Sequence, residues 1–87
     1  MKIKDGFILR QVAGSSIVVP IGKKAVDFNG MINLNDTGAF LWACLEKDIT
    51  TDELIKLMIN EYDVTYEQAK TDIGKFVVKL KDADLLE

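Results

Sequence analysis

The side chains that could carry catalytic chemistry are few in this sequence. Its 87 residues include no histidine and a single cysteine, Cys44, so the commonest general base and any cluster of Cys and His metal ligands are missing. The 14 acidic residues are spread over expected helix starts and polar faces, and the sequence has no glycine-rich phosphate loop and no nucleophile elbow. We therefore expect no catalytic residue, no metal site and no cofactor, and we expect that the protein is not an enzyme.

Charge and hydropathy set further limits on the class of protein. The formal net charge is -3, whereas nucleic-acid binding usually leaves a basic footprint. No apolar run is long enough to span a membrane, and the N-terminus does not resemble a signal peptide. A lone cysteine fits a reducing compartment. These features predict one cytoplasmic domain over residues 1–87 that binds neither nucleic acid nor membrane.

Backbone hydrogen bonding is the chemistry that remains, and one short stretch offers it. Residues 31–34 follow the tight-turn dipeptide Asn29-Gly30 and are expected to form a third strand without lysine or proline. Edge strands are usually protected by charge, proline or cover, and an unprotected edge can accept an extended peptide as an additional strand. The sequence leaves open that this edge is merely short or is covered by residues 23–29. The candidate binding residues here are Met31, Ile32, Asn33 and Leu34.

The last expected helix offers a second wall for such a site. At about 100° per residue, its buried face is centred near Ile73 and Leu80. One flank of that face carries a glycine, which costs about 1 kcal/mol in a helix interior relative to alanine but permits close approach by another chain. Lysines on the same flank would suit a peptide with carboxylates, although a solvated lysine face is the alternative. The candidate residues on this flank are Lys70, Gly74, Val77, Val78 and Lys81.

Turn signals and hydrophobic periodicity place these two walls within a larger fold. Residues 7–13 and 17–21 are expected to form a hairpin, and residues 25–28 are compatible with extended structure. Helices are expected over 36–46, from 50 to about 62, and from 65 to about 84, and their N-caps are Asn35, Thr50 and Thr65. This order predicts an α+β domain of the winged helix-turn-helix type, with a three-stranded antiparallel sheet followed by three helices.

The helix expected over 36–46 is apolar almost all round. Such a helix is either buried on both sides or in contact with a partner. The first hairpin can supply the cover. A homodimer through Trp42 and Ala43, or a contact with a partner enzyme, is the alternative that the sequence leaves open. The next helix is expected to bury Leu54, Ile55, Leu57, Met58 and Tyr62.

Four stretches taken together resemble the PqqD-like family, whose members are also called RiPP recognition elements. They are "FILRQVAGSSIVVPIG", "AVDFNGMINLNDTGAFLWACL", "TTDELIKLMINEYDV" and "DIGKFVVKLKDADLL". The resemblance covers residues 7–86, and it depends on the order of all four stretches. Asp84 stands where the family often has a glycine, and aspartate tolerates the left-handed conformation that ends a helix there.

The resemblance implies a non-catalytic peptide chaperone. Members of the family bind the leader segment of a ribosomally synthesised precursor, which adds as a strand beside the third strand and packs against the third helix. In pyrroloquinoline quinone (PQQ) biosynthesis the family member hands the precursor to a radical-SAM enzyme. For this chain it implies a groove between residues 31–34 and the flank of 70–81, and a precursor leader peptide and a radical-SAM or other peptide-modifying enzyme as partners. It does not identify the pathway.

A DNA-binding winged-helix regulator is the second interpretation of the same fold. It requires a basic face on the second or third helix. The stretch DELIKLMINEY carries one lysine against Asp52, Glu53 and Glu61, and this balance opposes contact with phosphates.

Overall fold

The computed structural model describes residues 1–22 and 32–87. Met31, the stretch 25–28 and the Asn29-Gly30 dipeptide therefore lie outside the described residues. The elements, in chain order, are β1 (Phe7–Val12), β2 (Ser15–Pro20), β3 (Ile32–Leu34), α2 (Asp36–Leu45), α3 (Thr51–Glu61) and α4 (Tyr66–Asp82). This order confirms the predicted α+β arrangement of three antiparallel strands followed by three helices.

The sheet has the order β1-β2-β3, with β2 in the middle. A two-residue turn joins β1 to β2, and both of its residues have positive φ, 50° at Ala13 and 81° at Gly14. This is the turn geometry that matches the twist of paired strands. β2 then pairs with β3 in the register Ser16↔Leu34, Ile17↔Asn33 and Val18↔Ile32. Among the strands that the structure describes, β3 is consequently at the edge.

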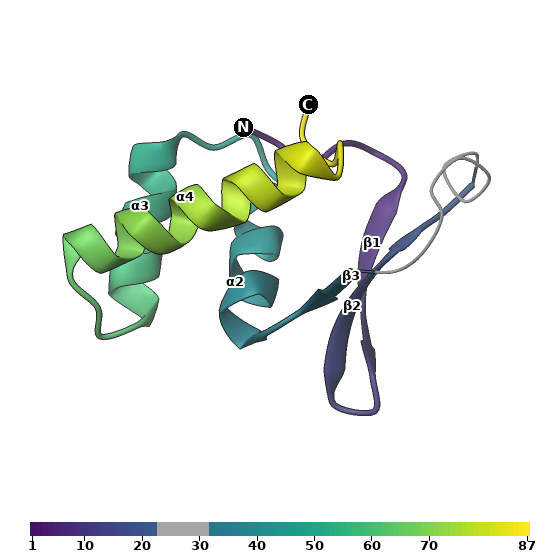
Figure 1. Cartoon of the computed structure of the whole chain (residues 1–87), viewed down its shortest axis with the longest axis horizontal. Coiled ribbons are helices and arrows are strands. Elements are labelled where there is room, and N and C mark those ends of the chain that lie inside the picture. Colours follow the sequence, from purple (N-terminus) through teal and green to yellow (C-terminus); the bar gives the residue numbers. More distant parts are fainter. Residues whose placement is uncertain (23–31) are drawn as a thin grey trace.

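The helices start where local capping chemistry dictates. The Asn35 side chain accepts a hydrogen bond from the Gly38 amide at the start of α2. Thr50 with Glu53, and Thr65 with Gln68, form complete capping boxes at the starts of α3 and α4, so the predicted caps are confirmed. Figure 1 shows the helices grouped together, with α4 lying across α2 and α3, and the β1–β2 hairpin projecting away from them.

α4 ends in a Schellman motif. Asp84 takes φ 59°, the Leu85 amide donates to the Leu80 carbonyl, and the Asp84 amide donates to the Lys81 carbonyl. The aspartate therefore occupies the left-handed position that often holds a glycine. The turn brings Leu85 and Leu86 back into the core.

The first residues of the chain are part of the core, which the sequence analysis did not anticipate. Ile3 is buried and forms an isolated antiparallel bridge with Leu86. The Lys4 amide donates to the Leu85 carbonyl at 2.8 Å, and the Ile3 amide donates to the Leu45 carbonyl at 2.9 Å. Both ends of the chain therefore lie close together, as Figure 1 shows.

The apolar helix α2 sends its largest side chain inward. Trp42 is only 1% exposed and belongs to the core cluster with Leu41 and Leu45. A contact between copies through Trp42 would therefore require the core to open, whereas Ala43 remains exposed. The prediction for the buried face of α3 is wrong at one position, because Leu57 is 42% exposed.

Candidate functional site

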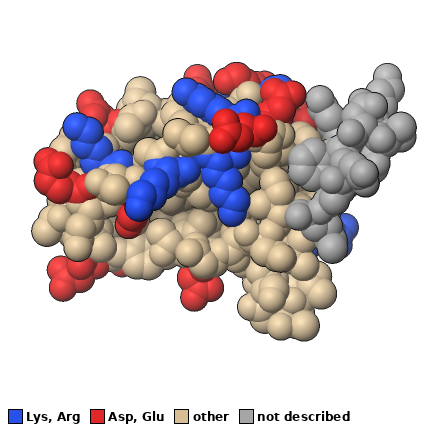
Figure 2. Space-filling view, viewed as in Figure 1, with Lys and Arg blue, Asp and Glu red and all other residues tan. Residues whose placement is uncertain are grey.

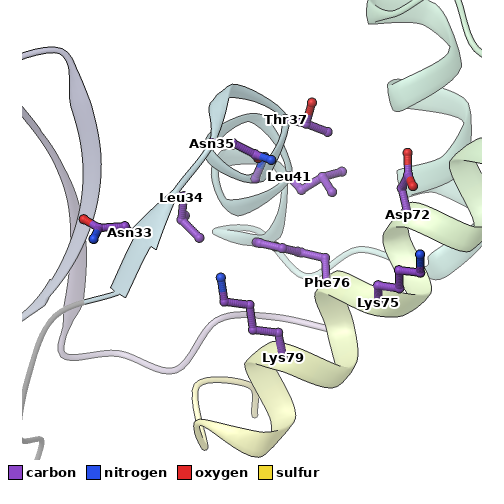
Figure 3. Close-up of a pocket in the computed structure, with 10 residues that line it drawn as sticks. Asn33, Leu34, Asn35, Thr37, Leu41, Asp72, Lys75, Phe76 and Lys79 are labelled. Carbon is purple, nitrogen blue, oxygen red and sulfur yellow. The ribbon is translucent and has the colours of Figure 1, made fainter.

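A groove of about 450 Å³ lies between β3 and α4, and the start of α2 closes one end of it. Figure 3 shows side chains from these three elements converging on it. We call it the β3–α4 groove. Its lining consists of Asn33, Leu34, Asn35, Thr37, Gly38, Leu41, Asp72, Lys75, Phe76 and Lys79.

The floor of the groove is apolar. Leu34, Leu41 and Phe76 all belong to the core and also line the groove. Phe76 keeps 8% of its surface exposed and points toward α2 and the end of β3 (Figure 3). An apolar side chain from another chain can therefore cover the parts of Leu34 and Phe76 that remain exposed.

Gly38 lets the start of α2 approach both walls. A Cβ placed on it would lie 3.1 Å from Oδ1 of Asn35, 3.3 Å from Cβ of Leu34 and 3.4 Å from Cε1 of Phe76. The distances to Asn35 and Leu34 are tighter than ordinary van der Waals contacts. The glycine of the Thr37-Gly38 pair therefore has a packing role, which the sequence analysis did not assign to it.

Asn35 fixes this corner of the groove, and its removal should weaken the fold measurably. Its Oδ1 accepts from the Gly38 amide at 2.7 Å. For Asn35→Ala we expect the free energy of unfolding to fall by about 1 kcal/mol, the usual effect of losing an N-cap. Urea titration measures this loss. Asn33→Ala is the matched control, because that side chain is exposed and should change stability by less than about 0.5 kcal/mol. Equal losses in both variants would contradict the capping role.

The direction of the backbone groups in β2 follows from the hairpin turn. In a two-residue turn the flanking residues, here Val12 and Ser15, form a hydrogen-bonded pair. Successive residues of a strand direct their amide and carbonyl groups to opposite sides. Ser15 therefore faces β1, and Ser16 and Val18 face β3.

This alternation leaves one residue of β3 with outward backbone groups. Leu34 and Ile32 lie opposite Ser16 and Val18, so they exchange hydrogen bonds with β2. The amide and carbonyl of Asn33 then point to the other side of β3. In residues 1–22 and 32–87 no strand pairs with that side. The Asn33 backbone is thus placed to pair with an added strand.

The rim of the groove carries charges of both signs, with lysine in excess. Asp72, Lys75 and Lys79 come from the same side of α4. Neither lysine takes part in an ion pair with any described residue; the two ion pairs found there join Met1 to Asp48 and Lys4 to Asp84. Figure 2, drawn from the same side as Figure 1, shows Lys and Arg side chains across the middle of the molecule.

The candidate residues from the sequence fall into three groups. Asn33 and Leu34 line the β3–α4 groove. Ile32 is half-buried and packs against the core, and Met31 lies outside the described residues. The residues expected on the α4 wall lie elsewhere: Lys70, Gly74 and Val78 line a separate hollow, Val77 packs against the core, and Lys81 is exposed in the last turn of α4.

The flank of α4 that faces β3 is therefore the opposite of the one the sequence analysis chose. Ile73 and Leu80 do mark the centre of the buried face. Lys79 lies about 110° from that centre on one side, and Gly74 and Lys81 lie about 110° and 90° from it on the other. The helix phase alone cannot tell these flanks apart. The position of β3 relative to α4 decides between them.

Outside the groove, three features bear on other functions: grouped metal ligands, the single thiol and the length of the helices. Among the residues that the structure describes, no three His, Cys, Asp or Glu side chains are grouped as metal ligands. Burial, and next the charge of Glu61, raise the pKa of the Cys44 thiol, so its nucleophilic thiolate is scarce near neutral pH. No helix in the described part of the chain is long and apolar enough to cross a membrane.

The fold and the groove together define a class of protein: a small α+β domain in which a strand at the edge of the described sheet lies beside a helix. A family model described as Coenzyme PQQ synthesis protein D (PqqD) matches residues 7–86. The chain therefore belongs to the PqqD family, as the sequence resemblance indicated.

Two solved structures are similar to the whole chain. "TbiB1 in Complex with the TbiA(beta) Leader Peptide" has a TM-score of 0.78 and 22% sequence identity, and the match covers 100% of this chain and 95% of that one. "Lasso peptide synthetase B1 complexed with the leader peptide" has a TM-score of 0.74 and 20% identity, and the match covers 97% and 93%. At these identities the likeness shows the shared fold. No curated protein was found to match.

Proposed function

We propose that this protein is a non-catalytic adaptor that binds the leader segment of a ribosomally synthesised precursor peptide. The observation that carries the proposal is the outward-facing backbone of Asn33, which borders a groove with an apolar floor. Membership of the PqqD family supports it. Further support comes from two structures of the same fold whose names include a leader peptide.

Strand addition divides the binding energy between two kinds of contact. Hydrogen bonds from the Asn33 amide and carbonyl accept any peptide sequence, because they involve only backbone groups. Every second side chain of the peptide then points toward α4, where Leu34 and Phe76 receive an apolar residue. Affinity would therefore come from the edge, and selectivity from the groove.

Presentation to a modifying enzyme is the second part of the proposal. An adaptor that holds the leader at β3 leaves the remainder of the precursor free to enter another active site. A radical-SAM enzyme is the partner that the resemblance to the PqqD-like family implies, and another peptide-modifying enzyme would use the same adaptor. The cytoplasm, which supplies both the precursor and a reducing environment for Cys44, is the compartment that fits.

Peptides from the neighbourhood of the gene test this function directly. The N-terminal halves of short open reading frames next to the gene can be synthesised with a fluorescent label and titrated with the protein. We expect one of them to bind saturably, in the micromolar range or tighter, as measured by fluorescence anisotropy. Binding of duplex DNA in a low-salt gel shift, with no response to any peptide, would instead support the regulator interpretation.

A further inference from the structure

The charge of the β3–α4 groove differs in sign from that of the whole chain. The formal net charge of the protein is -3, yet the groove is lined by two lysines and one aspartate. Neither Lys75 nor Lys79 is neutralised by an ion pair within the described residues. Unpaired cations at the rim of an apolar groove attract a carboxylate on the incoming chain, and because both lysines are exposed this attraction is modest and sensitive to salt.

The two lysines flank the apolar floor. In Figure 3 Phe76 lies between them, the Lys79 amino group extends toward β3, and Lys75 runs along the other side. Asp72, three residues before Lys75, also lines the groove and offsets part of the positive charge at that end. The end of the groove near Lys79 is therefore the more strongly basic.

An added strand would place its side chains in this groove with a fixed spacing. Residues i and i+2 of a strand point to the same face, about 6.6 Å apart. If one of them covers Phe76 and Leu34, the next side chain on the same face lies within reach of a flexible lysine. A residue in between points away from α4 and is not read by the groove.

We propose that the β3–α4 groove selects peptides that carry a large apolar side chain two positions away from an aspartate or glutamate, and that Lys79, assisted by Lys75, is the residue that recognises the carboxylate. The inference rests on the proposed function, because it concerns the same groove. It adds the chemical class of the ligand and the residues that determine specificity.

A displayed library of random 12-residue peptides provides the probe. It is selected against the wild-type protein and against two charge-reversed variants of equal net charge, K75E/K79E and K70E/K81E. Lys70 and Lys81 lie on the opposite flank of α4, outside the lining of the groove, so this pair is the matched control. Circular dichroism establishes that each variant is folded.

The peptide sequences that each variant enriches should show which flank of α4 recognises the acidic residue. Wild type and K70E/K81E should enrich peptides in which a large apolar residue and an acidic residue are separated by one residue, in either order. K75E/K79E should instead enrich lysine or arginine in place of the acidic residue. For the best wild-type peptide, glutamine in place of the acid should weaken binding about two- to fivefold, the usual range for a solvent-accessible ion pair. That difference should shrink in 0.5 M salt, because the Debye length falls to a few ångströms.

Failure of this inference and failure of the proposed function give different results. Two outcomes would overturn the charge selectivity alone. In the first, the enriched peptides lose binding to Asn33→Pro but show no preference for an acidic residue. In the second, they show that preference, and K75E/K79E leaves it unchanged. Enriched peptides whose binding does not depend on Asn33, or the absence of any enrichment, would overturn strand addition at β3 and the selectivity with it.

Discussion

Asn33→Pro should abolish peptide binding while leaving the protein folded. The Asn33 amide points away from β2, as the register with Ile17 requires, and proline is tolerated at an edge strand where the amide faces outward. Its ring removes the donor and occupies the space of the added strand. We expect an affinity loss of at least about 30-fold, corresponding to about 2 kcal/mol for the lost bond and the unsatisfied carbonyl that remains. Fluorescence anisotropy with a peptide selected on the wild type measures this loss.

Two controls separate the backbone from the side chain. Asn33→Ala keeps the amide and should retain binding within about threefold, because the exposed side chain contributes at most a weak contact. Ile32→Pro removes an amide that faces Val18 of β2 and should instead destabilise the sheet. Wild-type affinity in a folded Asn33→Pro protein would contradict strand addition at this edge.

Trp42→Ala should destabilise the protein more than the changes proposed above at Asn33 and Asn35. Trp42 is 1% exposed and is among the largest fully buried side chains of the described residues. Truncating a buried tryptophan lowers the free energy of unfolding by about 3–5 kcal/mol. A domain of this length has only about 4–13 kcal/mol in total. We therefore expect a large drop in the urea midpoint, or a protein that fails to fold.

This experiment also tests the alternative in which α2 mediates a dimer. Ala43→Ser, at the exposed neighbouring position, should leave stability within about 0.5 kcal/mol, and Trp42→Phe should lose less than Trp42→Ala. The urea midpoint of the wild-type protein should be independent of protein concentration. A midpoint that rises with concentration, together with a stable monomeric Trp42→Ala variant, would assign Trp42 to a subunit contact.

Local rules in the sequence were sufficient to predict the elements and their caps. Thr50 with Glu53, and Thr65 with Gln68, are three residues apart in each case, and the capping geometry they predict is present. The third strand was also located by sequence, because residues 32–34 form β3 as expected. That its outer edge is unprotected stays a prediction. Asp84 ends α4 in the way its tolerance of positive φ suggests.

The features that sequence could not supply depend on how distant elements meet. Lys79 and Lys81 are equivalent as lysines on the flanks of one helix, and only the place of β3 puts Lys79 in the groove. Ile3 is buried because the chain ends pair with each other, a contact across nearly the whole chain. Gly38 resembles an ordinary helix-start glycine until Leu34 and Phe76 are brought against it.

The most direct test of the peptide adaptor is the position of a bound peptide relative to β3. An unlabelled peptide selected on the wild type can be mixed with ¹³C,¹⁵N-labelled protein and studied by isotope-filtered NOE spectroscopy. We predict cross-strand NOEs between the peptide backbone and Asn33, with slowed hydrogen exchange of the Asn33 amide. Peptide NOEs confined to the hollow lined by Lys70, Gly74 and Val78, with the Asn33 amide unchanged, would contradict the account.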